Sequence, residues 1–246
     1  MMPINYMDPP VPTGFSAVGG AWDTGYIIRR DTDGSEFVWV PVGALPDTGR
    51  FGGRMQSFGV RDYGYSGSDG GCDRQELTAQ EISVEKYGGF YLSRYCLSMG
   101  EDDALHSVPD AMPHTGINRV DAVNAARDLA AGEASAHLPY AAEMDSALAW
   151  LIQSGKKDSS SIANAARRRD TRAHQEKLTR TGSCESLYAN GIYDLAGTVD
   201  EWTQDLTDGA FLWGCRPCAW PGTSRCYFAP YACYSYTGLR AALYIP

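Results

Sequence analysis

The sequence predicts a protein of the α+β class, in which short strands and a few helices share one domain. Three observations support this class. The chain of 246 residues contains 27 glycines, 13 prolines and 11% aromatic residues, which is typical of many turns and short strands. A turn sequence, Asp31–Gly34, separates two segments with alternating apolar residues. Two later segments, Arg119–Ala131 and Ala141–Ile152, carry apolar residues at helical spacing.

The N-terminal part is predicted to be an extended arm followed by a β-hairpin. Residues 1–20 are rich in proline and glycine, so we expect an extended arm that is either disordered or docked on a neighbouring copy of the chain in a homo-oligomer. The predicted domain spans residues 21–246. Trp22–Arg29 and Glu36–Val42 are its first two strands. Leu45–Arg74 is glycine-rich without a clear period and is predicted to be a long loop.

The middle of the chain is predicted to contain a core strand and two helices. Phe90–Leu92 is an apolar run after two glycines and should be a buried strand. Arg119–Ala131 should be an amphipathic helix that ends at Gly132, and Ala141–Ile152 a second helix that follows Pro139. Ser159–Leu178 is polar and basic, and either a surface helix or a loop is compatible with it.

Residues Gly191–Trp202, reading GIYDLAGTVDEW, are predicted to form a tight buried turn. The glycines provide positive φ where the chain must turn sharply. Asp194, Asp200 and Glu201 place carboxylate oxygens at short spacing, which is the ligand type that calcium prefers. Two interpretations stay open from the spacing alone: a hydrogen-bonded polar turn, or a calcium site.

Charge and cysteine content exclude several functional classes. The formal net charge of -9 disfavours nucleic acid and anionic membranes as partners. No apolar run approaches the about 20 residues of a membrane-spanning helix, and no signal peptide is expected because a basic region followed by an apolar stretch is missing at the N-terminus. Seven cysteines are an odd number, so at least one thiol is unpaired or bonded between chains.

The segment GIYDLAGTVDEWTQD resembles the GLYDMAGNVWEWT signature of the formylglycine-generating-enzyme (sulfatase-modifying factor) family, a variety of the C-type lectin fold. Three other segments agree in order: Glu36–Val42 with the opening strand of that family, Ala136–Trp150 with its RLPTEAEWEYA helix, and Thr237–Leu243 with its closing GFR strand. The resemblance implies a C-type lectin fold of the formylglycine-generating-enzyme subtype. It also implies a calcium ligand at Glu201, although Thr198 and Asp200 depart from the motif.

The cysteines bear on two alternative functions that need a metal. Members of that enzyme family hold copper(I) with two thiolates in a C-x4-C spacing near the C-terminus. Here the successive C-terminal cysteines are three, eight and seven positions apart, so we do not expect a copper oxidase. The C-x2-C pair at Cys215 and Cys218 is half of a zinc knuckle without a matching second half. We expect a non-catalytic protein whose one optional cofactor is calcium.

The tail Phe211–Pro246 differs in composition from the rest of the chain. It contains no Asp, Glu, Lys, Asn, Gln, His or Met, but it holds four of the seven cysteines, five tyrosines and three arginines. Tyrosine and arginine dominate binding hot spots. The pattern resembles the variable region of proteins diversified by retroelements, in which adenines of asparagine codons in a template are randomised. A Cys- and Tyr-rich pair of core strands is the alternative interpretation.

The resemblance implies a hypervariable ligand-binding surface within about residues 211–240. The predicted contact residues are Cys215, Arg216, Cys218, Arg225, Tyr227, Tyr231, Cys233, Tyr234 and Tyr236. The overall pattern also resembles proteins encoded by phages and prophages. It therefore implies a receptor-binding protein on a phage tail tip that recognises a protein or glycan on a host cell, with the bacterial cell surface as the alternative location.

Overall fold

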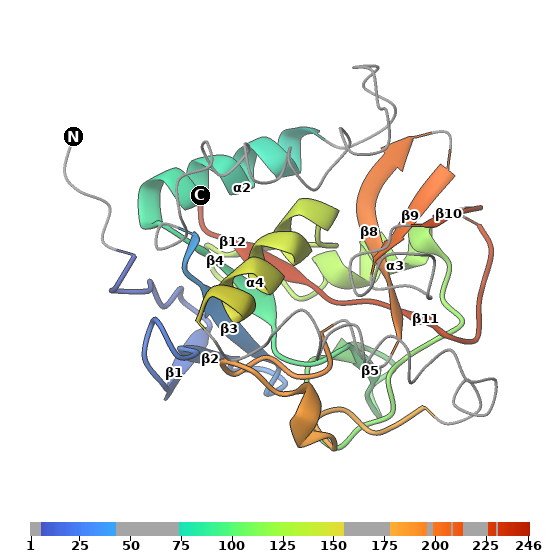
Figure 1. Ribbon diagram of the computed structural model, residues 1–246, viewed down its shortest axis with the longest axis horizontal. Coiled ribbons are helices and arrows are strands. Elements are labelled where there is room, and N and C mark those ends of the chain that lie inside the picture. The colour runs from blue at the N-terminus through green and yellow to red at the C-terminus, as the bar shows by residue number, and fades with distance from the viewer. Residues whose placement is uncertain are drawn as a thin grey trace.

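The computed structural model describes residues 6–42, 74–154, 178–195, 199–207, 209–213, 226–229 and 231–246. In this part of the chain the larger sheet has the order β1-β2-β3-β4-β12-β7 with antiparallel pairing. Its strands are β1 (Phe15–Gly19), β2 (Ile27–Arg30), β3 (Glu36–Val40), β4 (Phe90–Ser93), β7 (Ser135–His137) and β12 (Ala242–Tyr244). The C-terminal strand β12 passes through the middle of the domain (Figure 1).

A smaller sheet has the order β10-β9-β8-β11, and β5 and β6 form a separate pair. These strands are β5 (Ser98–Met99), β6 (Leu105–His106), β8 (Asp200–Thr207), β9 (Gly209–Trp213), β10 (Cys226–Phe228) and β11 (Thr237–Gly238). The helices are α2 (Arg74–Tyr87), α3 (Arg119–Arg127), α4 (Ala141–Gln153) and the short 3-10 helix η3 (Glu185–Leu187). The described chain is therefore a mixed α and β protein with mostly antiparallel sheets, in agreement with the predicted α+β class.

The central strands of the larger sheet are covered on both faces, and their side chains alternate between two hydrophobic clusters. On β3, Val38 belongs to one cluster and Phe37 and Trp39 to the other. On β4, Leu92 and Tyr91 divide in the same way. Because neighbouring residues of a strand point to opposite faces, a strand covered on both sides has to be apolar throughout.

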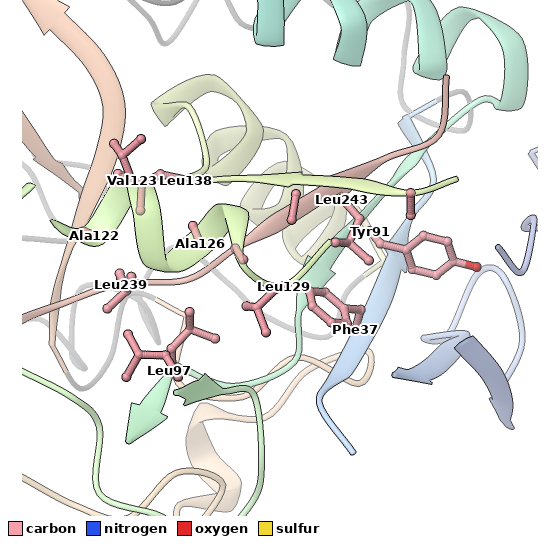
Figure 2. Close-up of a cluster of buried hydrophobic side chains, with 14 of the residues drawn as sticks. Phe37, Tyr91, Leu97, Ala122, Val123, Ala126, Leu129, Leu138, Leu239 and Leu243 are labelled. Carbon is pink, nitrogen blue, oxygen red and sulfur yellow. The ribbon is translucent and has the colours of Figure 1, made fainter. Parts of the chain in front are cut away.

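Helices α2 and α4 pack on the first cluster, and α3 packs on the second. Val84 of α2 joins Met144 and Leu148 of α4 in the first cluster. Figure 2 shows the second cluster, in which Ala122 and Ala126 of α3 lie with side chains from β3, β4 and β12. The small alanine side chains allow the helix to approach the sheet closely.

The predicted hairpin and both predicted helices are confirmed. β2 and β3 pair antiparallel, and Gly34 in the connecting turn has a φ of 76°. Helix α3 begins after Asn118, whose side chain accepts a hydrogen bond from the Asp121 amide, and it ends at Arg127, four positions before the predicted Ala131. Helix α4 extends to Gln153, one position beyond the predicted end.

The structure corrects the prediction for the N-terminal arm. Phe15–Gly19 forms strand β1 of the larger sheet instead of remaining an isolated arm. The preceding residues pack on the same chain, since the Trp39 Nε1 group donates to the Tyr6 carbonyl at 3.1 Å and the Tyr91 hydroxyl donates to the Pro10 carbonyl at 2.9 Å. Within residues 6–19, therefore, this segment belongs to the domain.

Helix α2 is the longest element that no sequence pattern predicted. Its buried face carries polar residues: the Gln80 Nε2 group donates to Glu143 Oε1 at 2.5 Å, and Ser83 Oγ accepts from the Ile245 amide at 3.0 Å. Two segments discussed from the sequence, Leu45–Arg74 and Ser159–Leu178, lie almost entirely outside the described residues.

Candidate ligand-binding surface

The C-terminal tail forms both edges of the smaller sheet. β10 pairs antiparallel with β9 at one edge, and β11 pairs parallel with β8 at the other. The chain therefore crosses from one edge of the sheet to the other between Phe228 and Thr237, and Figure 1 shows this red segment on the outer side of the domain. We call residues 231–236, which lead directly into β11, the display loop.

The predicted contact residues fall into three groups. Tyr227 lies in edge strand β10, opposite Phe211 of β9. The display loop contains Tyr231, Cys233, Tyr234 and Tyr236. The remaining predicted residues lie outside the described part of the chain: Cys215, Arg216, Cys218 and Arg225.

Two successive backbone turns shape the display loop. The Ala232 amide donates to the Ala229 carbonyl at 3.0 Å, and the Thr237 amide donates to the Tyr234 carbonyl at 3.0 Å. Each of these bonds joins residue i to residue i+3, as in a β-turn. The side chains of the residues inside the turns take no part in these bonds.

Main-chain hydrogen bonds also fasten the display loop to distant parts of the fold. The Gly116 amide is shared between the carbonyls of Tyr234 (3.0 Å) and Thr237 (3.2 Å). The Asp200 amide donates to the Tyr236 carbonyl at 3.0 Å. Because every donor and acceptor is a backbone group, these bonds use no side-chain atom of the loop.

The side chains of the display loop alternate in exposure. Tyr231 is 79% exposed, and Cys233 and Ser235 are exposed as well, whereas Tyr234 and Tyr236 are half-buried. Cys233 is a free thiol. Residues 231–236 are therefore not part of an apolar core strand. The burial of β9 and β10, to which the alternative interpretation of a Cys- and Tyr-rich pair of core strands applies, lies outside what the structure describes.

The Trp202 side chain lies next to Tyr234 of the display loop, on the side of the domain core. This side chain is buried, and its Nε1 group donates to the Ile117 carbonyl at 2.8 Å. The Tyr234 ring lies 6.4 Å from the Trp202 ring, and the Tyr236 ring lies 5.7 Å from that of Tyr234. At the start of β11 the chain passes so close to its neighbours that a Cβ on Gly238 would lie 3.0 Å from the carbonyl oxygen of His114.

A buried polar cluster lies behind this surface. Arg240 is fully buried, and its Nε donates to Glu201 Oε1 at 2.7 Å. Its other nitrogens donate to the carbonyls of Ser93 at 3.0 Å and Tyr193 at 2.5 Å. Burial raises the pKa of the neighbouring Cys96 thiol well above its ordinary value, so the thiol stays protonated and donates to Glu201 Oε1 at 3.0 Å. The guanidinium thus joins β4, the Tyr193 turn and β8.

Glu201, the predicted calcium ligand, is a member of this buried cluster. Its Oε1 atom accepts from both Arg240 and Cys96. Its Oε2 atom and Oδ1 of buried Asp194 have no hydrogen-bond partner among the described residues. A calcium ion there would have to share the Glu201 carboxylate with the Arg240 guanidinium, while Thr198 lies outside the described residues.

The described residues contain no group of three or more His, Cys, Asp or Glu side chains that could hold a metal ion. Cys215 and Cys218, on which the copper and zinc alternatives depend, are not among them, and the side chain of Cys226 is not described either. In the same part of the chain, no helix is long and apolar enough to cross a membrane.

Comparison of the sequence with family models and with curated proteins finds no relative. No protein-family model matches this chain, and no curated protein matches its sequence significantly. The function has to be inferred from the residues and the geometry described above.

Three residues important to this surface were missing from the predicted contact set. Gly116 anchors the display loop, Ser235 is exposed at its tip, and Arg240 joins the elements beneath it. Arg240 belongs to the closing GLR segment, so the motif itself was a usable signal. No local pattern marks Gly116, because its partner Tyr234 is more than a hundred positions away in the chain.

Proposed function

We propose that this chain is a non-catalytic ligand-binding protein whose C-terminal tail presents a variable recognition surface. The display loop is the described part of that surface, and its exposed side chains would contact the ligand. A protein or glycan on a host-cell surface is the proposed ligand, with the phage tail tip as the proposed location and the bacterial cell surface as the alternative. No cofactor is part of this proposal.

The observation that carries the proposal is the way in which the display loop is held. The bonds from Gly116, Asp200 and Thr237 all join main-chain groups. A loop held in this way keeps its path when its exposed side chains change, so a large set of sequences can be displayed on one backbone. If contacts of the exposed side chains fixed the backbone, substitutions of those residues would alter the shape of the loop.

The composition of the tail agrees with this arrangement. An exposed free thiol at Cys233 next to the exposed Tyr231 is an unusual choice for a stable surface, because free thiols are prone to oxidation. Such a residue is expected if the position is filled at random from codons that end in C. The fixed members of the tail, such as buried Arg240, are those whose side chains the fold requires.

We also propose that the fold is a C-type lectin fold of the formylglycine-generating-enzyme subtype. The ion pair between Glu201 and Arg240 supports this assignment, because it links the two segments that carry the resemblance, GIYDLAGTVDEW and TGLRAAL. The pairing of β11 with β8 brings the same two segments together through the backbone.

Sequencing of the DNA around the gene tests the proposed function. We expect a near-copy of the region that encodes the tail, differing from it at adenines, next to a gene for a reverse transcriptase. In a population of the source organism, substitutions should concentrate in codons of the exposed tail residues and spare the codon of Arg240. Absence of both the near-copy and this concentration of substitutions would contradict the proposal.

A further inference from the structure

The exposed and half-buried residues of the display loop play different roles. Tyr231, Cys233 and Ser235 are exposed, whereas Tyr234 packs against the edge of the hydrophobic cluster that contains Trp202. The composition of the tail makes no such distinction, since the predicted contact set included Tyr234 and omitted Ser235.

We propose that Tyr231, Cys233 and Ser235 form the ligand-contacting face of the display loop, and that Tyr234 is a positioning residue that holds this face in place. This assignment rests on the proposed function and adds to it one contact residue, Ser235. It also removes the two half-buried residues, Tyr234 and Tyr236, from the predicted contact set.

The position of Tyr234 explains its role. Its carbonyl accepts two hydrogen bonds, one from Gly116 and one from Thr237, so it is the point at which the loop is tied to the fold. Its ring lies against Trp202, which is itself fixed by a hydrogen bond to Ile117. Ring packing therefore keeps the Tyr234 carbonyl in place beneath the two amides.

Ser235 occupies the opposite position in the same turn. It is the first residue after Tyr234 in the turn closed by the Thr237 amide, and its side chain is exposed. The turn bond uses no atom of this side chain, so a larger residue can replace serine and extend into solvent. Together with Tyr231 and Cys233 it places one hydroxyl, one phenol and one thiol on the exposed side of the loop.

Hydrogen exchange of the full chain tests the positioning role of Tyr234. In Tyr234→Ser we expect the Gly116 and Thr237 amides to exchange about tenfold faster, because the loop loses an aromatic contact worth about that factor in its closed population. Tyr234→Phe should restore the wild-type rates. The matched control Tyr231→Ser should leave both amides unchanged, and so should Ser235→Arg.

These rates decide the assignment. Wild-type exchange of both amides in Tyr234→Ser would overturn the positioning role, as would an equal acceleration in Tyr231→Ser. If Tyr234→Ser fails to fold, Tyr234→Leu replaces it, and a rate no faster than that of Tyr234→Phe would overturn the role.

Two surface-display libraries of the full chain test the contact face. One library varies positions 231, 233 and 235, the other varies positions 232, 234 and 236, and both are selected on immobilised lysozyme as the probe. We expect binders from the first library and few folded members in the second. Binders recovered equally from both would overturn the assignment while leaving the proposed function intact. No binders from either library would count against the proposed function and the assignment together.

Discussion

Removal of the Arg240 side chain is the most direct test of the scaffold on which the tail is displayed. Arg240 is fully buried, and the Arg240→Met substitution keeps much of its volume while removing the charge and all of the donors. Glu201 would then be a buried carboxylate without its counter-ion, and the carbonyls of Ser93 and Tyr193 would lose their guanidinium donor.

The contacts of Arg240 allow the cost to be estimated. Removing one partner of a buried ion pair costs about 3–5 kcal/mol, because the remaining charge is left uncompensated. In a chain of this size, 1 kcal/mol changes the melting temperature by about 2–4 °C. We therefore expect Arg240→Met to lower the melting temperature by about 10 °C.

Thermal and chemical unfolding measure this effect. Arg180→Met is the matched control, because it makes the same substitution at a side chain that is 56% exposed. The unfolding free energy of this variant should differ from that of the wild type by no more than about 0.5 kcal/mol. The double variant Glu201→Met with Arg240→Met should cost less than the sum of the two single variants, because neither charge is then left alone. A decrease in unfolding free energy below about 1 kcal/mol for Arg240→Met would show that the buried ion pair is not needed for stability. Strictly additive decreases in the double variant would show that the two charges do not interact.

Two further variants test contacts outside the Arg240 cluster. Burial lowers the pKa of His106, but its hydrogen bonds to Asp102 (Nε2, 2.7 Å) and Asp33 (Nδ1, 2.5 Å) outweigh this and raise the pKa above 6.5. The stabilisation by protonated His106 is therefore complete below pH 6.5, and it is lost as the pH rises through the raised pKa. His106→Gln should lower the free energy of unfolding more at pH 5.5 than at pH 8.5. An equal decrease at both pH values would contradict this. Gly238→Ala should destabilise the fold by about 1–3 kcal/mol, because the added Cβ would crowd the His114 carbonyl. A thermal unfolding curve identical to that of the wild type would contradict this and would show that the His114 backbone moves aside without cost.

Local sequence patterns were sufficient for the hairpin and for α3 and α4. In each case the signal lies within the element: turn residues between alternating strands, or apolar residues at helical spacing. Helix α2 has no such signal. Its buried residues Gln80 and Ser83 are polar and are satisfied by partners in other elements, so a search for an apolar stripe cannot find it.

The candidate site was predictable in its location but not in its geometry. Composition alone singled out the tail, because Asp, Glu and Lys are absent there and Tyr, Cys and Arg are frequent. Composition assigns the same character to Tyr231 and Tyr234, which the structure separates into an exposed and a half-buried residue. The difference depends on Trp202, which approaches the loop through the pairing of β8 with β11.

By itself, the amino-acid sequence determined the local elements and the unusual composition of the tail, because turns, amphipathic periods and composition are properties of neighbouring residues. Only the tertiary structure decided how the display loop is held and which of its side chains reach solvent. Those properties depend on hydrogen bonds that Gly116, Asp200 and Arg240 make to residues far away in the chain. The path of the backbone and the packing of the sheets determine which of these distant residues come into contact.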